Sequence, residues 1–357
     1  MLNSIKNGSP WYDTKGERIH AHGGSVMYLD GYYYWYGENK EKTTGKDDTW
    51  HWGVRCYRST DLYNWEDMGL IIKPNTEDPN SSIHPTARMD RPHIIYNKKT
   101  QKFVCWLKVM TLKGDIQTET VLTADHLLGP YTIVREGLRP LGMSAGDFDL
   151  VVDEETGKAY YFFERVHDAT ICAELTEDYT DVNGTYSLHF PHPEGAPYVR
   201  EATAHCLRNG KHYLITSGTT GYYPNPSEAA IADTYHGPYE IQGDPHIGDT
   251  SHTSFHSQIS SIFKVPGKKD LYIACADRWM PGYETMTYSD LLELRALKRA
   301  KKSAEMEKMM EHFGVPMYTS TATTNTSLAE YIWLPLRFEG EKVYIDWKEE
   351  WRIEDYE

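Results

Sequence analysis

The sequence predicts an all-β protein, a five-bladed β-propeller with a helical insertion in its last blade. Three observations support this prediction. Five segments of similar design recur along the chain, a second turn follows most of them, and one helical stretch interrupts the last repeat. A length of 357 residues is ordinary for one large β domain, so we expect residues 1–357 to form a single propeller.

Each of the five segments has a polar turn followed by a short run rich in Tyr and β-branched residues. Their turns recur at intervals of 53 to 69 residues, at Gly31, Thr100, Gly157, Gly210 and Gly267. A turn between β-favouring runs indicates a hairpin. Most of the hairpins are followed by another polar turn and a short outer strand, as in RSTDLYNWEDMG from Arg58. Four strands per unit, repeated five times, make a five-bladed propeller.

The last repeat is interrupted by a segment with helical periodicity, from Tyr288 to about Phe313, within an insertion that we place at residues 286–328. Its apolar residues recur at roughly helical spacing: Leu291, Leu294, Leu297, Met306, Met309, Met310 and Phe313. Such a stripe needs an apolar cover. We expect it to pack on the propeller itself; the alternatives are a second subunit or the edge of the pocket. After the insertion, EYIWLPLRFEGEKVYIDW returns to β patterning and completes the last blade.

The composition argues against several classes of protein. Lys and Arg total 37 against 52 Asp and Glu, a formal net charge of −15, so the chain lacks the basic surface that nucleic acids and anionic membranes require. No apolar run approaches the ~18 residues of a membrane-spanning helix. The N-terminus has no apolar signal segment, so we expect a cytoplasmic protein, unless a leader has been removed. Nothing in the sequence indicates an oligomeric state.

Cysteine and aromatic residues carry two further signals. The five cysteines are far apart and form no CxxC pair, which indicates buried free thiols. The chain contains 10 Trp and 27 Tyr, side chains whose flat apolar faces and polar edges suit the surface of a sugar. The alternative is that aromatic residues are simply abundant in β-rich chains.

Four carboxylates stand at similar places in successive repeats, close to the hairpins: Glu38, Asp90, Asp147 and Glu201. The fifth repeat offers Gln258 at the matching position. The innermost strands of a propeller surround its axis, so we expect these side chains to converge. Converging carboxylates are what glycoside hydrolysis needs, because one protonates the leaving oxygen and a neighbouring charge raises its pKa. The alternative is that each is a surface charge or a turn cap.

Other kinds of chemistry find little support. The sequence contains no GxSxG elbow, Walker loop or GxGxxG fingerprint. His252 and His256 are four residues apart, but their Ser- and Thr-rich surroundings do not indicate the helix that a zinc pair at this spacing requires.

Several segments resemble glycoside hydrolase family 43, and within it the exo-β-1,3-galactanase subgroup. They are HGGSVMYLDGYYYWYGE, RSTDLYNW, DRPHIIYN, REATAHCLRNGKHYLITSGTTGYYPN, and DRW followed by YIWLPLRFEG. The resemblance spans almost the whole chain except roughly residues 285 to 328. It implies a five-bladed propeller and an inverting, exo-acting glycosidase without a catalytic cofactor. It also allows a structural Ca²⁺ near the axis, with His256 as a candidate ligand.

The resemblance also implies roles for individual residues. Glu201 would be the general acid, Asp147 would tune its pKa, and Gln258 would stand where a base is expected. The terminal sugar would be held by the remaining candidates: Glu38, Asp90, Thr220, Trp35 and Tyr222. We expect Gln258 to orient water through its carbonyl oxygen; the alternative is a sugar ligand with no part in water activation.

Two departures from the family pattern bear on function. Most members carry an Asp on the first innermost strand as the base, whereas the equivalent stretch here reads Gly23, Gly24 and Ser25, an absence that the galactanase subgroup shares. Asp90 also stands where the subgroup usually has a Glu, one methylene longer.

We therefore expect release of a terminal galactose from the non-reducing end of a β-1,3-linked galactan or galacto-oligosaccharide. The alternatives are an α-L-arabinofuranosidase, a β-xylosidase, or a propeller that binds sugar without catalysis.

Overall fold

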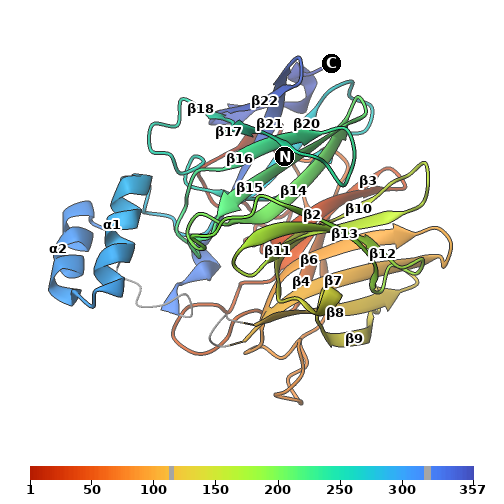
Figure 1. The fold of residues 1–357 in the computed structure, drawn as a ribbon, viewed down its shortest axis with the longest axis horizontal. Coiled ribbons are helices and arrows are strands. Elements are labelled where there is room, and N and C mark those ends of the chain that lie inside the picture. The colour runs from red at the N-terminus through yellow and green to blue at the C-terminus, as the bar shows by residue number, and fades with distance from the viewer. Residues whose placement is uncertain (112–115, 317–322) are drawn as a thin grey trace.

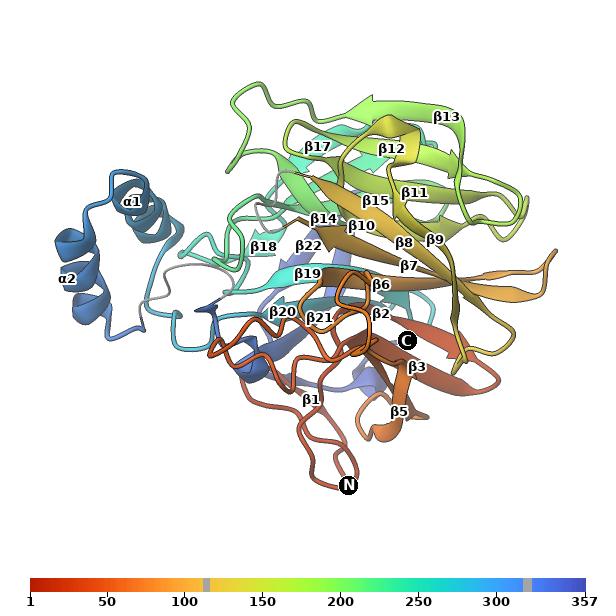
Figure 2. The ribbon, with the colours of Figure 1, turned by 90° about the horizontal axis from the view of Figure 1, so that it is seen from below.

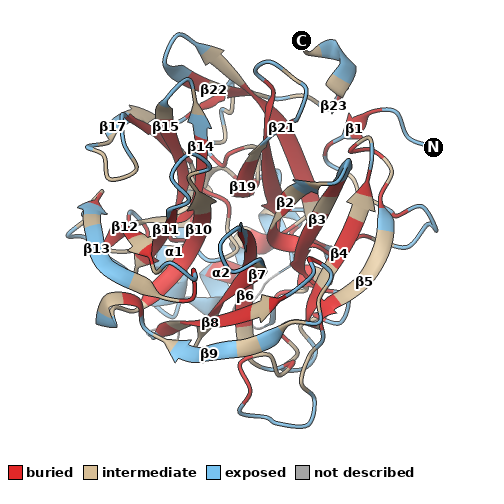
Figure 3. Cartoon of the chain, turned by 90° about the vertical axis from the view of Figure 1, so that its right-hand side faces the viewer, coloured by how far each residue is buried: buried red, intermediate tan, exposed pale blue. Residues whose placement is uncertain are grey.

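The computed structural model describes residues 1–111, 116–316 and 323–357, and it contains five sheets arranged around one axis. Figure 3 looks nearly along this axis and shows the sheets as five blades. The prediction of a five-bladed propeller is confirmed.

The first four blades each contain four antiparallel strands in chain order from the axis outward. Their bounds are β2 (His22–Leu29), β3 (Tyr32–Glu38), β4 (Val54–Ser59) and β5 (Glu66–Ile72) in the first blade; β6 (Arg88–Asn97), β7 (Lys102–Met110), β8 (Gln117–Ala124) and β9 (Thr132–Leu138) in the second; β10 (Ala145–Val152), β11 (Ala159–Arg165), β12 (Ala169–Leu175) and β13 (Val182–His189) in the third; and β14 (Arg200–Arg208), β15 (Lys211–Gly218), β16 (Glu228–Ala232) and β17 (Glu240–Gly243) in the fourth.

The fifth blade has one strand more than predicted. Its order from the axis is β19 (Gln258–Lys264), β20 (Tyr272–Arg278), β21 (Glu330–Glu339), β22 (Lys342–Asp346) and β18 (His246–Ile247). The short outer strand β18 runs parallel to β22. A two-stranded sheet of β1 (Ile5–Lys6) and β23 (Glu350–Trp351) joins the two ends of the chain. Short 3₁₀ turns lie at Pro140–Gly142, Thr326–Leu328 and Ile353–Asp355.

Each predicted hairpin turn joins an innermost strand to the second strand of its blade. At Asp30–Gly31 and at Asn209–Gly210 both turn residues have positive φ. A two-residue type I′ turn requires this conformation, and it matches the twist of the paired strands. At these two hairpins the turn residues therefore fix where the innermost strand ends and the second strand begins.

The five innermost strands β2, β6, β10, β14 and β19 form a closed ring, each beside the next. All five have a register shift within their first few residues, for example between Asp90 and His93 on β6 and between Glu201 and Ala204 on β14. Bulges of this kind redirect side chains. Here they occur at one end of the ring, where the predicted site residues stand.

The predicted helical segment forms two helices, α1 (Tyr288–Arg299) and α2 (Ser303–Phe313). Thr287 caps α1 through a reciprocal pair of hydrogen bonds with Asp290, and α2 ends at Gly314 in the left-handed conformation. Figures 1 and 2 show both helices beside one end of the ring. Residues 317–322 of the predicted insertion lie outside the described residues. Neither helix is long and apolar enough to cross a membrane.

The apolar stripe of the helices is covered by the propeller's own segments. Leu291, Leu294, Met306 and Met310 are buried in one cluster with aromatic and Met side chains from 279–286. Tyr222 and Tyr223 pack against the same cluster. This agrees with the expectation that the stripe packs on the propeller, and it brings α1 close to the predicted site. The five cysteines are free and buried, as predicted.

Candidate active site

A cavity of about 450 Å³ opens at the end of the ring that carries the bulges. Seven of the predicted site residues line it: Glu38, Asp90, Asp147, Glu201, Thr220, Tyr222 and Gln258. Asp90, Asp147, Glu201 and Gln258 each stand within the first three residues of an innermost strand, whereas Glu38 is the last residue of β3. The structure therefore brings the five repeat-related polar residues together.

Trp35 does not line the cavity, so its predicted contact with the sugar does not agree with its position. Its ring is 2% exposed and lies in an aromatic cluster with Trp65, Tyr331 and Trp333. Strand β3 is buried on both faces, and Trp35 faces the core between the first and fifth blades. Alternation along the strand could not distinguish these two buried faces.

Asp147 is held by two cations from the second blade. Lys108 Nζ lies 2.5 Å from one carboxylate oxygen, and the Arg91 guanidinium lies 2.8 Å from the other. Burial alone would raise the pKa of Asp147, but Arg91 and Lys108 outweigh it and lower this pKa to about 2. Asp147 is therefore a fixed negative charge within the cavity wall.

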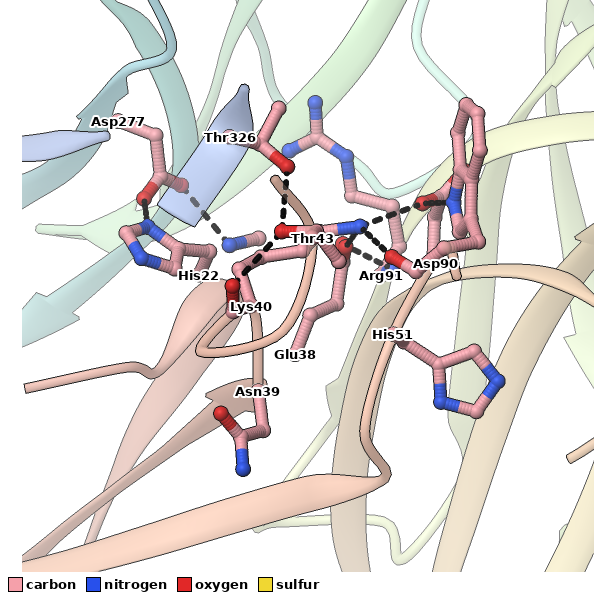
Figure 4. A network of polar contacts seen from close by, with 12 residues as sticks. His22, Glu38, Asn39, Lys40, Thr43, His51, Asp90, Arg91, Asp277 and Thr326 are labelled. Carbon is pink, nitrogen blue, oxygen red and sulfur yellow. Dashed lines mark hydrogen bonds and ion pairs between the residues drawn. The ribbon is translucent and has the colours of Figure 1, made fainter. Parts of the chain in front are cut away.

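Glu38 and Asp90 share the fully buried Lys40, as Figure 4 shows. Lys40 Nζ lies 2.7 Å from Glu38 and 3.7 Å from Asp90, and it donates a hydrogen bond to the Trp50 carbonyl. The Trp50 indole donates a hydrogen bond of 2.6 Å to Asp90. Burial opposes ionisation of Asp90, but Lys108 and Lys40 lower its pKa. Burial raises the pKa of Glu38 to about 7 despite its contact with Lys40.

Glu201 differs from these three carboxylates because no cation lies within ion-pairing distance of it among residues 1–111, 116–316 and 323–357. Burial raises the pKa of Glu201 well above its usual value, and the negative charges of Asp147 and Glu164 raise it further. A carboxyl group of this kind keeps its proton near neutral pH, as a general acid must.

Gln258 links the acid to the charged network. Its amide donates to Ser217 Oγ at 2.9 Å and to Glu201 at 3.4 Å. Its carbonyl accepts hydrogen bonds from Arg91 at 2.5 Å and from the Trp279 indole at 3.3 Å. Both N–H groups and both lone pairs of the Gln258 side chain are therefore engaged in hydrogen bonds.

Gly23 and Gly24, at the place where the family resemblance implies a base, are closely packed against neighbouring atoms. A Cβ atom on Gly23 would come within 2.4 Å of Glu38 Oε1, and one on Gly24 would come within 1.9 Å of the Tyr36 carbonyl. Glu38 Oε1 instead accepts a hydrogen bond from the Arg91 amide at 3.0 Å. The Glu38 carboxylate therefore lies next to the position that a side chain on Gly23 would take.

Aromatic side chains form one wall of the cavity. Tyr222 lies between Trp50 and Trp279, with ring centroids 6.2 Å and 5.1 Å away. The Thr220 hydroxyl accepts a hydrogen bond from Asn225 at 2.7 Å and donates to the Tyr223 carbonyl. Flat aromatic faces beside buried polar groups suit a sugar ring.

No group of three or more His, Cys, Asp and Glu side chains in the described parts of the chain is placed to hold a metal ion. His256 lies away from the cavity lining, and its Nε2 donates to the Met286 carbonyl at 3.0 Å, so this nitrogen is not a free ligand. The predicted structural Ca²⁺ is therefore not confirmed by the described residues.

Sequence reasoning missed the cations and indoles of the site: Lys40, Arg91, Lys108, Trp50 and Trp279. Arg91 and Trp279 lie inside segments that carry the family resemblance, DRPHIIYN and DRW, so they could have been found. Lys108 stands on a second strand, and its role depends on a contact with a neighbouring blade that the sequence does not show.

Comparisons with known proteins agree with this geometry. The model of glycosyl hydrolases family 43 matches residues 20–294. A solved family 43 β-1,3-galactosidase is 27% identical with a TM-score of 0.77, and the alignment covers 99% of this chain and 65% of that chain. A second one, solved with galactodeoxynojirimycin, is 27% identical with a TM-score of 0.75, covering 98% of this chain and 100% of that chain.

An exo-β-1,3-galactanase from Clostridium thermocellum is 26% identical with a TM-score of 0.73, covering 97% of this chain and 66% of that chain. The chain thus spans about two thirds of the length of the first and third of these proteins and the whole of the second. No curated protein gives a significant match. The propeller, its ring of carboxyl groups and the match to most of the chain lead to one conclusion: the protein belongs to glycosyl hydrolases family 43.

Proposed function

We propose that the protein is an inverting, exo-acting glycosidase that releases a terminal galactose from a β-1,3-linked galactan or galacto-oligosaccharide. Glu201 is the general acid in this proposal. The observation that carries it is the contrast among the cavity carboxyl groups: three of them are ion-paired with Lys or Arg, whereas Glu201 has no such partner among the described residues.

Asp147 supports the acid electrostatically. Its charge is fixed by Arg91 and Lys108, and it raises the pKa of Glu201. Because Asp147 has both oxygens engaged by cations, it is poorly suited to accept a proton from water. It therefore keeps Glu201 protonated until the leaving oxygen arrives.

Gln258 orients the attacking water. Its amide contacts Glu201 at 3.4 Å, whereas an inverting site keeps its two catalytic groups ~6.5–9.5 Å apart to admit the sugar and the water. Substrate must therefore enter between Glu201 and Gln258 and break this contact. One of the two hydrogen bonds to the Gln258 carbonyl must also be exchanged for water, and the longer one, from Trp279, is the weaker.

The substrate is inferred from the solved relatives, which are described as β-1,3-galactosidases and an exo-β-1,3-galactanase. The cavity volume of about 450 Å³ and its aromatic wall are compatible with one terminal sugar. The absence of a base at Gly23 favours one alternative, a propeller that binds sugar without catalysis.

The test combines a substrate panel with product stereochemistry. We expect hydrolysis of β-1,3-galactobiose and aryl β-galactoside, and none of aryl α-L-arabinofuranoside or β-xyloside. Proton NMR of the early product should show the inverted anomer. We expect Gln258→Ala to abolish turnover while substrate still binds, and Gln242→Ala, a surface amide that contacts the Glu341 carbonyl, to behave like the unmodified protein.

Each outcome decides between the alternatives. Binding of galactobiose without hydrolysis would establish the silent sugar-binding propeller. Early product of retained configuration would overturn the inverting mechanism. Unchanged kcat with weakened binding in Gln258→Ala would reduce Gln258 to a sugar ligand.

A further inference from the structure

The inserted helix α1 brings a basic face to the mouth of the active cavity. Arg295, Lys298 and Arg299 stand at i, i+3 and i+4, so their side chains share one side of the helix. Arg295 lines the cavity, and its guanidinium donates a hydrogen bond of 3.0 Å to the Thr219 carbonyl. Lys298 and Arg299 are exposed beside it.

None of these three cations forms an ion pair with a carboxylate in the parts of the chain that the structure describes. This is unusual in a protein with a net charge of −15, where other arginines such as Arg55 and Arg208 pair with aspartates. Charges in the last turn complement the helix dipole, which accounts for Lys298 and Arg299. It does not account for Arg295, which lies one turn earlier and points into the cavity.

Arg295 is held in surroundings that disfavour its charge. Burial lowers the pKa of Arg295, and the like charge of Arg299 lowers it further. Burial and then Arg295 lower the pKa of Lys298 in the same way. An anion placed between these side chains would relieve their repulsion and replace the missing counter-charge.

The position of Arg295 relative to the acid indicates which part of a substrate it would meet. Arg295 donates to the Thr219 carbonyl, and the Thr219 hydroxyl donates at 2.9 Å to the carbonyl of Val199, two residues before Glu201, so Arg295 and the acid lie on the same side of the cavity. A general acid protonates the oxygen that joins the terminal sugar to the leaving sugar. If Glu201 is the acid, a side chain on its side of the cavity would meet the leaving sugar, and Arg295 is such a side chain.

A second cation without a carboxylate partner in the described residues lines the same cavity. Arg88 lies over the Trp50 ring, 5.1 Å from its centroid. Arg91, Lys108 and Lys40 are by contrast used to hold Asp147, Asp90 and Glu38. The cavity thus has more positive charge at its lining than its own carboxylates neutralise, because Glu201 keeps its proton.

We propose that Arg295, supported by Lys298 and Arg299, forms a subsite for an acidic leaving sugar, so that the preferred substrates carry a carboxylate on the residue next to the terminal galactose. This inference rests on the proposed function, because it assigns the leaving-sugar side from the role of Glu201. A guanidinium matches the two oxygens of a carboxylate with parallel N–H groups, which makes a uronic acid the favoured partner. A sulfate ester offers similar oxygen atoms, and the experiment separates the two.

The test uses four disaccharides that differ at one carbon atom of the leaving sugar. They are β-D-galactosyl-(1→3)-galactose, the corresponding galacturonic acid, its methyl ester, and the galactose 6-sulfate. Affinity is measured by calorimetry on Glu201→Gln, which keeps the cavity shape and removes the acid. We expect the acid to bind on the order of ten-fold more tightly than the neutral sugar and the ester, with a preference that weakens in salt.

The charge is then removed one residue at a time, with Glu201→Gln as the background. Adding Arg295→Gln should bring the affinity ratio of acid to neutral disaccharide close to one, and Arg295→Lys should retain part of it. Lys301→Gln, an exposed cation beyond the end of α1, should leave the ratio unchanged. Thermal unfolding checks that each variant is folded.

The outcomes separate this inference from the proposed function. If the unmodified protein hydrolyses the neutral disaccharide but the acid binds no more tightly, the subsite is wrong and the proposed function stands. If the acid is preferred but neither disaccharide is hydrolysed, Arg295 binds an acidic sugar, whereas the proposed function and the assignment to a leaving sugar are both wrong. Tighter binding of the sulfate than of the carboxylate overturns the assignment to a uronic acid, and an absence of all binding overturns the subsite.

Discussion

Asp147 and Asp149 lie two residues apart on the innermost strand β10, yet they face opposite ends of the central ring. Their exposed fractions are nearly equal, 6% for Asp147 and 5% for Asp149. The pKa of Asp147 is lowered to about 2, whereas burial raises the pKa of Asp149 to about 7. Asp147 therefore stays charged and Asp149 stays neutral through most of the acidic pH range.

The difference comes from the partners that neighbouring blades supply. Asp147 faces Arg91 and Lys108 in the active cavity. Asp149 faces the second cavity of the ring, where it accepts hydrogen bonds from two backbone amides and lies 3.2 Å from His93. Burial, followed by the charge of Arg91, lowers the pKa of His93 to about 3, so this neighbour supplies no charge.

The comparison teaches that burial alone does not decide ionisation in this propeller. The cations Arg91 and Lys108 of the adjacent blade decide the ionisation of Asp147. Glu201 stands at the active end of the ring but resembles Asp149 in lacking an ion pair among the described residues, and its pKa is raised accordingly. In the active cavity Asp147, paired with two cations, stays charged, and Glu201, unpaired among the described residues, keeps its proton, whereas the pKa of Glu38, paired with Lys40 alone, is raised to about 7.

The largest effect should follow from removing the neutral carboxyl group of the active end. We expect Glu201→Gln to lower turnover of β-1,3-galactobiose by ~10²–10⁴-fold or more, because general acid assistance is lost. Aryl galactosides with good leaving groups should lose less, since they need little protonation. Steady-state kinetics on both substrates measures the difference.

Glu119→Gln is the matched control for this variant. Glu119 is also a buried glutamate whose pKa burial raises well above the usual value, but it contacts the Tyr161 hydroxyl and does not line the cavity. Its substitution should leave turnover nearly unchanged. Full turnover of galactobiose by Glu201→Gln would show that another group is the acid.

A smaller effect should follow from removing one cation that keeps Asp147 charged. We expect Lys108→Met to lower kcat/KM by about 10–100-fold, the cost of a lost hydrogen bond to a buried charge. The pKa of Asp147 should rise, so activity should fall at a higher pH than in the unmodified protein as the solution is acidified. The pH–rate profile measures this shift.

Lys102→Met provides the control for Lys108→Met on the same strand. Lys102 forms an exposed ion pair with Asp125, 2.5 Å away, far from the cavity. Loss of this ion pair should change neither kcat/KM nor the acidic limb of the pH–rate profile. An unchanged acidic limb in Lys108→Met would mean that Arg91 alone keeps Asp147 ionised.

The features predicted correctly from sequence are those that local chemistry determines. The Asp30–Gly31 turn needs positive φ at both residues, so it marks the end of an innermost strand without reference to the rest of the fold. The helical character of residues 288–313 follows from periodicity, whereas their division into α1 and α2 and the cap formed by Thr287 and Asp290 came from the structure. Repeat spacing then placed Asp147 and Glu201 at matching positions.

The features that could not be predicted depend on contacts between blades. Lys40 and Lys108 stand beyond or within second strands, and only the closed ring brings them to Asp90 and Asp147. Trp35 fills the core because both faces of β3 are buried.

The smallest and most specific effect concerns the free energy of unfolding as a function of pH in Asp147→Asn and Asp149→Asn. The pKa of Asp147 falls from 3.8 to about 2 on folding, so its stabilisation is complete above about pH 4 and is lost only as the pH falls through 2. Asp147→Asn should therefore destabilise the protein by the same amount at pH 4, 6 and 8. The reason for that destabilisation is that Arg91 and Lys108 lose their common partner.

The stability that Asp149 contributes depends on pH with the opposite sign. Its pKa rises from 3.8 to about 7 on folding, so between about pH 4 and 7 the folded state holds a proton that the unfolded chain has released. Stability contributed by Asp149 must fall as the pH rises through this window, on the order of 1–4 kcal/mol in total. Asn does not titrate, so Asp149→Asn should be most destabilising at pH 4 and progressively less so at pH 6 and 8. Urea denaturation at the three pH values measures both variants against the unmodified protein. Parallel pH dependence in the two variants would show that the cations of the second blade do not distinguish the two ends of the ring.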